Sequence, residues 1–314
     1  MIDKPTSPNR NKRFDISFHS ILRLIFIFGM ILVSAAILFF LVYRQWDILL
    51  QHKWSFRALP IFLSFILYFI ALLLVIWIWT RIMVAVGADI PALKHFRYYC
   101  LSNLAKRIPG TIWYIASRAQ FYRTEAVPMR FTSLASGVEA AIATVAGILV
   151  ALYFAIPIIS AYGISLLWFG LALLIGLFSI HPRVLGWLLK RLGADTSCFS
   201  YALLIKWLLG YILVWVLGGG VLYSIGNIIT PIEFKHISYL IGSWALVGVF
   251  TTVLFFSPSN LGVTEVGLSL LLSNIMPAPI AVLVAIAARI ILILYDIIWA
   301  IVSATVLNRS NQPI

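Results

Sequence analysis

The sequence predicts an all-α, polytopic integral membrane protein with about seven to eight transmembrane helices and one or two re-entrant or broken helices. Of its 314 residues, 62% are hydrophobic and 11% are charged, whereas soluble domains average about 45–50% and about 25%. The mean hydropathy is +1.04, and the apolar residues fall into long runs separated by short basic connections. These observations exclude a soluble enzyme, a disordered protein and a nucleic-acid-binding domain.

Six runs reach the length of about 20 apolar residues that a helix needs to cross the hydrocarbon of a bilayer. They cover 22–43, 59–80, 132–155, 161–180, 207–229 and 279–307, and a slightly shorter uncharged run covers 238–256. The first run follows a basic tail, as in a signal peptide, but it exceeds the roughly 7–15 residues of a signal sequence and no small-residue cleavage site follows it. We therefore expect a retained first helix.

Two further apolar stretches are interrupted. The stretch 95–122 contains Lys106-Arg107-Ile108-Pro109-Gly110 in its middle, so it is not expected to cross as an ordinary helix. The stretch 260–276 contains Glu265 and begins within Ser257-Pro258-Ser259-Asn260, so it either spans or dips into the membrane and returns. The chain then divides into a basic tail (1–20), a single transmembrane domain (21–307) and a short C-terminal tail (308–314).

The distribution of cations predicts the orientation. The segment up to 23 and the connections 81–131 and 181–206 carry 17 of the 23 Lys and Arg residues, whereas the alternate connections carry four. Because cytoplasmic loops are enriched in Lys and Arg, we expect a multi-pass protein of the cell inner (cytoplasmic) membrane with its N-terminus inside. Cys100 and Cys198 then lie on the reducing side, where a disulfide is not expected. The side of the C-terminus depends on whether 260–276 crosses.

Four ionisable residues lie inside apolar runs: Glu139, Glu265, Arg289 and Asp296. Such residues are functional candidates by default, and they must face protein or a watery cavity. Arg289 and Asp296 are seven positions apart, which places them on one face of the last helix. Either Arg289 pairs with Glu139 or Asp296 as a structural lock between helices, or the four groups line a polar path for a headgroup or a proton. The two interpretations are compatible.

The two interruptions have a similar design, because each places the N-terminus of a new helix inside an apolar hairpin. Asn103, Lys106 and Arg107 precede Pro109-Gly110, and Thr111 can cap a helix that carries Trp113, Tyr114 and Arg118. Pro258 to Gly262 opens the helix that carries Glu265. A pair of Gly/Pro-interrupted segments, one in each half of a chain, is typical of a transporter binding site. The alternative for the first interruption is an amphipathic helix on the cytoplasmic surface with its aromatic residues in the interfacial belt.

At these residues the chain resembles the lysylphosphatidylglycerol synthase transmembrane region family, a flippase-like membrane domain. Residues 103–113 are similar to that family's Arg-x-hydrophobic-Pro-Gly-x-x-Trp pattern, and Pro258 to Glu265 resembles its Pro-x-x-x-Gly-hydrophobic-x-Glu pattern. Glu139 corresponds to its acidic residue in the next helix. The resemblance covers roughly 20–307, and the chain departs from it at Ala140, where an Arg is common, and at 259–261, where glycines are favoured.

The resemblance implies a stand-alone member, without the aminoacyl-lipid synthase domain, that moves a phospholipid or lipid-linked glycan between leaflets. Lys106, Arg107 and Arg118 would attract the lipid phosphate, Glu139 and Glu265 would receive the headgroup, and Arg289 with Asp296 would balance the internal charge. The site residues that it carries over are Arg107, Pro109, Gly110, Trp113, Glu139, Pro258, Gly262 and Glu265; Asn103, Lys106, Arg118, Arg289 and Asp296 join them from the spacing and burial arguments.

The alternative function is that of an accessory protein that presents a lipid carrier to a glycosyltransferase or another lipid-modifying enzyme. Enzymatic activity is not expected, because every His lies at the end of a run or in a connection. An intramembrane enzyme that uses two buried acids is a weaker third possibility. Neither a nucleotide-binding loop nor metal-ligand spacing is present in the sequence, so we expect no metal, cofactor or nucleic-acid partner.

Overall fold

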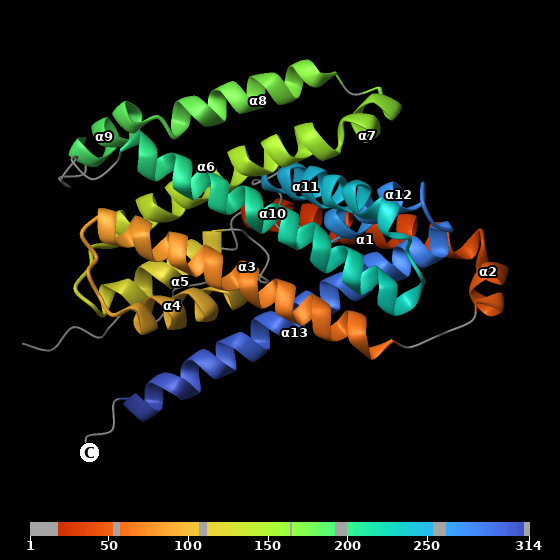
Figure 1. The fold of residues 1–314 in the computed structure, drawn as a ribbon, viewed down its shortest axis with the longest axis horizontal. Helices are drawn as coiled ribbons and strands as arrows, with labels where there is room; N and C mark the ends of the chain where they lie inside the picture. The colour runs from red at the N-terminus through yellow and green to blue at the C-terminus, as the bar shows by residue number, and fades with distance from the viewer. Residues whose placement is uncertain are drawn as a thin grey trace, which may run out of the picture.

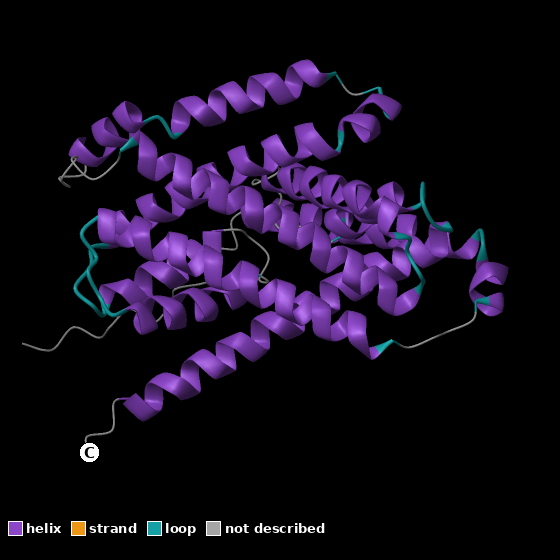
Figure 2. Ribbon diagram, viewed as in Figure 1, coloured by secondary structure: helices purple, strands orange, loops and turns teal. Residues whose placement is uncertain are grey.

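The computed structural model describes residues 18–52, 57–106, 112–163, 165–191, 200–253 and 262–310. Within these ranges every regular element is a helix and none is a strand (Figure 2). The all-α prediction is therefore confirmed.

Most helices begin and end close to the boundaries expected from the apolar runs, whereas the expected span 161–180 is a helix of only 14 residues, Leu166–Ser179. Pro91, Pro128 and Pro277 each stand directly before a helix, where the missing amide hydrogen of proline costs nothing and its fixed φ favours the first turn. The elements are α1 (Phe18–Tyr43), α2 (Trp46–Gln51), α3 (Ala58–Ala85), α4 (Ala92–Ala105), α5 (Ile112–Arg123), α6 (Met129–Phe154), α7 (Ile156–Ala161), α8 (Leu166–Ser179), α9 (Pro182–Arg191), α10 (Tyr201–Ile229), the 3₁₀ turn η1 (Phe234–His236), α11 (Ile237–Val253), α12 (Val263–Leu272) and α13 (Ala278–Ser310).

Among the residues that the structure describes, four helices are long and apolar enough to cross a membrane: α3, α6, α10 and α13. The bent pair α8 and α9, with an angle of 53° between its two helices, makes a fifth if it is one span. The 28 residues of α3 extend about 42 Å at 1.5 Å per residue, which exceeds the roughly 30 Å of bilayer hydrocarbon. The structure is thus compatible with a membrane protein, while the predicted count of seven to eight spans is not confirmed.

The interrupted stretch 95–122 forms two packed helices instead of one span, and 260–276 forms one short helix that packs against the helix before it. The stretch 95–122 divides into α4 and α5, which pack against each other, as α11 and α12 do (Figure 1). The ten residues of α12 extend only about 15 Å, which is too short to cross a bilayer on their own, and α11 with α12 forms a hairpin. The segments 107–111 and 254–261, which include Arg107, Pro109, Gly110 and Pro258, lie outside the described residues.

The order of a long helix, a helical hairpin and a second long helix occurs twice along the chain. It appears as α3, α4–α5 and α6, and again as α10, α11–α12 and α13. Figure 1 shows that α3 and α10 run in opposite directions, and that α6 and α13 do so too. The packing repeats as well, because α6 contacts α11 while α13 contacts α4, and α8 contacts α6 while α1 contacts α13. The two halves therefore form an inverted repeat.

The two hairpins enter the bundle from opposite ends. The connections on either side of α4–α5 lie at the end of the molecule where α9 lies and α13 finishes; we call this the cation-rich end (Figure 1). The connections on either side of α11–α12 lie at the other end, near α2 and α7.

Glycines allow the closest helix contacts. A Cβ atom at Gly219 of α10 would lie 2.5 Å from the Cα of Ile241 on α11, and one at Gly242 of α11 would lie 2.7 Å from the carbonyl oxygen of Phe154. Both distances are shorter than a Cβ tolerates. Gly219 belongs to a run of three glycines, which therefore serves helix packing.

Candidate functional site

A buried ion pair joins the first hairpin to the rest of the bundle. Nη1 of Arg118 on α5 donates to Oε2 of Glu139 on α6. The side chain of Arg118 is 0% exposed and that of Glu139 is 8% exposed. The hydroxyls of Tyr99 on α4 and Tyr211 on α10 both donate to Oε1 of Glu139, each at 2.9 Å. The carboxylate therefore accepts hydrogen bonds from three helices, as a buried charge requires.

Aromatic rings surround the guanidinium of Arg118. Its central carbon lies 4.1 Å from the ring centroid of Tyr99, 4.3 Å from that of Trp79 and 5.3 Å from that of Tyr114, which are distances typical of cation–π contact. Nε donates to Oγ of Ser102 at 3.0 Å. Nη2 is buried and has no hydrogen-bond partner among the described residues. Nη2 of Arg118 can therefore donate a hydrogen bond to an oxygen of a ligand.

Polar residues of α4 lie beside this pair. Nζ of Lys106 lies 5.1 Å from the ring centroid of Tyr114 and 5.7 Å from that of Tyr99. Asn103 is 9% exposed, and its buried Oδ1 accepts no hydrogen bond within the ranges that the structure describes. Trp113, at the start of α5, is 51% exposed. Lys106 is exposed and shares its aromatic neighbours with Arg118, so an anion approaching Lys106 comes close to the buried pair.

A second ion pair lies in the other hairpin. Oε1 of Glu265 on α12 lies 3.4 Å from Nη1 of Arg289 on α13, and its Oε2 accepts the backbone N–H of Gly262 at 2.8 Å. The carboxylate therefore caps the free amides at the start of α12 and interacts favourably with the helix dipole. Gly262 has a φ of +87°, and a Cβ there would lie 2.2 Å from Cβ of Ser34 on α1. Only glycine fits this position.

The third group connects α13 to α3. Asp296 accepts a hydrogen bond from the hydroxyl of Tyr68 and is 6% exposed. One residue earlier, the hydroxyl of Tyr295 lies 2.7 Å from Oγ of Ser64. Asp296 therefore lies at a polar contact between two long helices.

The expected lock between Arg289 and either Glu139 or Asp296 is wrong. In the part of the chain that the structure describes, the ion-pair partner of Arg289 is Glu265, and that of Glu139 is Arg118. Seven residues of helix separate Arg289 from Asp296, which is about 10 Å along the axis. Through their contacts with other described residues, the candidate charges therefore form three groups held by different neighbours.

The surface-helix alternative for the first interruption is also wrong. Arg118, Ala119 and Tyr122 on α5 are almost fully buried, and α5 packs against both α4 and α6. A helix lying on a membrane surface would instead present its charged face to water.

Several residues of the first site have no strong sequence signal. Tyr99, Ser102 and Lys106 recur at helical spacing on α4, so their shared face is visible once the helix is recognised. Trp79 and Tyr211 lie within long apolar runs, where nothing in the local pattern separates them from lipid-facing aromatic residues. Their roles follow only from the packing of α3 and α10 against each other and against α6.

The two ion pairs occupy equivalent places in the inverted repeat. Each joins the second helix of a hairpin to the long helix that follows it. Glu139 is the eleventh residue of α6 and Arg289 is the twelfth residue of α13. The signs of the charges are reversed between the halves. The hairpin supplies the cation, Arg118, in the first half and the carboxylate, Glu265, in the second.

No protein-family model matches the chain, and no curated protein is significantly similar to it. The resemblance to the lysylphosphatidylglycerol synthase transmembrane region therefore depends on the two residue patterns and on Glu139. The fold and the ion pairs are observed in the structure and do not depend on that resemblance.

Proposed function

We propose that this protein moves a phospholipid or a lipid-linked headgroup between the two leaflets of the cytoplasmic membrane. The observation that carries the proposal is the inverted pair of hairpins, each joined to the following long helix by an ion pair. Inverted repeats with broken helices are the architecture in which membrane transporters bind a polar substrate between two alternately opening halves.

The Arg118–Glu139 pair is the substrate-responsive contact of the first hairpin. The hairpin leaves α6 only if each buried charge finds a new partner, because an unpaired charge at this depth is costly. For Arg118 a lipid phosphate supplies that partner, since its oxygens accept from Nη2 and then replace the carboxylate at Nη1. Glu139 meanwhile keeps the hydrogen bond from the hydroxyl of Tyr211 on α10, which is not part of the hairpin. Lys106, exposed at the cation-rich end, attracts the phosphate first.

The Glu265–Arg289 pair performs the corresponding exchange in the second hairpin. Arg289 is 19% exposed, so the phosphate released from the first pair is received by a cation that is already partly accessible. Because the second hairpin enters from the opposite end, binding at the two pairs in turn carries the headgroup from one side to the other.

Reconstitution into liposomes tests the proposal. Vesicles contain phosphatidylglycerol with a fluorescent headgroup, and a membrane-impermeant quencher reports how fast the inner-leaflet label reaches the outside. We expect faster exchange than in protein-free vesicles, and a loss of at least tenfold in Glu139→Gln. The matched control is Glu233→Gln, which breaks the exposed Glu233–Lys235 pair and leaves the rate unchanged.

Two results would contradict the proposal. Exchange no faster than in empty vesicles is one, and an unchanged rate in folded Glu139→Gln is the other. Specific lipid binding without translocation would support the accessory function, in which the protein presents a lipid carrier to another enzyme.

A further inference from the structure

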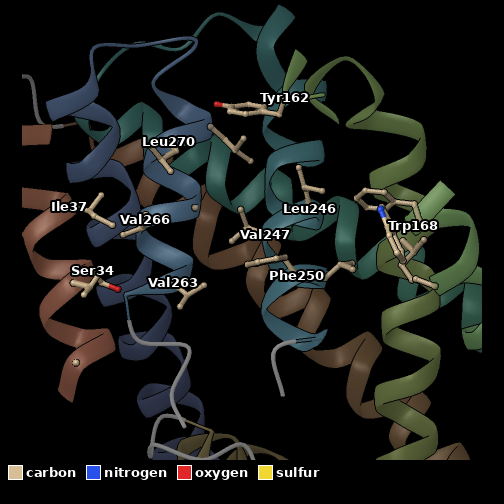
Figure 3. A pocket seen from close by; sticks show the side chains of 18 residues that line it. Ser34, Ile37, Tyr162, Trp168, Leu246, Val247, Phe250, Val263, Val266 and Leu270 are labelled. Atoms are coloured by element: carbon tan, nitrogen blue, oxygen red, sulfur yellow. The ribbon is translucent and has the colours of Figure 1, made fainter. Parts of the chain in front are cut away.

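A large cavity lies away from the Arg118–Glu139 pair, between α1, α8, α11 and α12 (Figure 3). Its volume is about 1080 Å³, which is slightly above the range of roughly 300–1,000 Å³ for small-molecule sites. Its wall includes Val33 and Ile37 of α1, Trp168 of α8, Phe250 of α11, and Val266 and Leu270 of α12. The cavity therefore lies beside the second hairpin, α11–α12.

The wall of this cavity carries no charged side chain among its described residues. Its hydroxyl groups belong to Ser34 and Tyr162, which Figure 3 shows at opposite ends of the space. Cavities lined by hydrocarbon do not hold ordered water, because water needs two to four polar partners. The chemistry of the wall selects a hydrocarbon occupant.

The surroundings supply such an occupant. The outer faces of α1 and α8 expose large apolar side chains, including Phe39 at 68% and Leu174 at 65%, as expected of surfaces in contact with lipid. Since α1 packs on α12 and α13 while α8 packs on α6, the cavity lies beside bilayer hydrocarbon. From Val263 to Leu270 the wall extends about 10 Å along α12, a large part of the roughly 15 Å of hydrocarbon in one leaflet.

One end of the cavity is polar and accessible. Nδ2 of Asn274 donates to the hydroxyl of Tyr162 at 3.2 Å and to the hydroxyl of Tyr239 at 3.1 Å. Tyr162 is 51% exposed and lies in the connection between α7 and α8, at the end opposite the cation-rich end. Amide and phenol groups beside an apolar space match a molecule with a polar head and a hydrocarbon tail.

We propose that this cavity binds an acyl chain of a membrane phospholipid whose headgroup lies at Tyr162, Tyr239 and Asn274. This tail site rests on the proposed function for the identity of the lipid. It gives the transported lipid a place for its acyl chain at the end of the protein opposite Lys106. Binding there does not require that the lipid be moved, so the two proposals are separable by experiment.

Photolabelling of the full-length protein tests the site. The protein is reconstituted in phosphatidylglycerol vesicles that contain a fraction of lipid with a diazirine on one acyl chain, and the labelled residues are mapped by mass spectrometry. We expect labelling of Val266 and Leu270 to exceed that of the lipid-facing Phe39 at least threefold. Ala172→Trp fills the cavity and removes the excess, whereas Leu174→Trp, one half-turn away on the lipid face of α8, leaves it unchanged.

Even labelling of all exposed apolar surfaces would overturn the inference, as would labelling that Ala172→Trp does not reduce. If Ala172→Trp fails to fold, Val266→Trp fills the same space from α12 and is read at Leu270. Enriched labelling together with no headgroup exchange would support the cavity and refute transport. Headgroup exchange together with even labelling would refute the cavity alone.

Discussion

Removing one charge of the buried Arg118–Glu139 pair tests whether the pair is only structural. Glu139→Gln keeps the size of the side chain and an oxygen that accepts from Tyr99 and Tyr211. It removes the negative charge opposite a guanidinium that is 0% exposed. The free energy of unfolding should therefore fall, because the folded protein must hold an unpaired buried cation.

The size of the loss follows from the surroundings of Arg118. Breaking a buried ion pair by removing one partner costs about 3–5 kcal/mol. Here the lower value applies, because the rings of Tyr99 and Trp79 at 4.1 and 4.3 Å and the hydroxyl of Ser102 remain in contact with the cation. A loss of about 3 kcal/mol corresponds to a fall in Tm of about 6–12 °C, measured by tryptophan fluorescence on heating the detergent-solubilised protein.

A double variant separates stability from transport. Arg118→Met with Glu139→Gln leaves no unpaired charge and keeps the acceptor for both tyrosines, so Tm should return to within about 3 °C of the wild type. Headgroup exchange should stay as low as in Glu139→Gln, because the charges that bind the phosphate are gone. Recovery of both Tm and exchange would show that the pair is only a structural lock. An unchanged Tm in Glu139→Gln would refute the reasoning about burial.

Three smaller perturbations test other parts of the structure. Glu265→Gln should lower Tm less than Glu139→Gln does, since its cationic partner is 19% exposed and the amide oxygen still accepts the helix N–H; an equal or larger fall would contradict this. Gly219→Ala should lower Tm because a Cβ meets α11, whereas Gly137→Ala, with nothing within 4 Å, should leave Tm unchanged or raise it; equal effects would argue against close α10–α11 packing. In the connection after α5, the hydrogen bond from Lys94 at 2.8 Å lowers the pKa of Glu125, so its contribution to stability is present above the ordinary carboxyl pKa and is lost as the pH falls through the lowered value. The Tm of the wild type should then fall more on acidification than that of Glu125→Gln, and parallel pH profiles would refute the assignment.

The residues of the first interruption show how far sequence reasoning reaches. Lys106 and the Pro-Gly pair after it predicted that 95–122 would not form one helix, and α4 and α5 confirm it. Glu139 and Arg118 were both identified, one as a buried acid and the other as a cation beside the interruption. Their direct contact was not predicted, because 21 residues separate them and only the packing of α5 against α6 brings them together.

The second interruption was less certain from the sequence. Glu265 signalled that 260–276 was unusual, but the apolar length allowed either a span or a hairpin. The structure decides for the hairpin, since α12 has ten residues and starts at a glycine with a positive φ. That outcome also places the end of α13 beside the cation-rich connections.

The sequence alone determined the helical class, the positions of the long apolar helices and the places where helices break. These properties depend on local quantities: the length of an apolar run, the position of proline and glycine, and the period of the polar residues. The tertiary structure alone decided which charges pair, the inverted relation of the two halves and the cavity between α1 and α8. Each of these depends on contacts between helices far apart in the chain, and an apolar helix surface does not specify which neighbour it will meet.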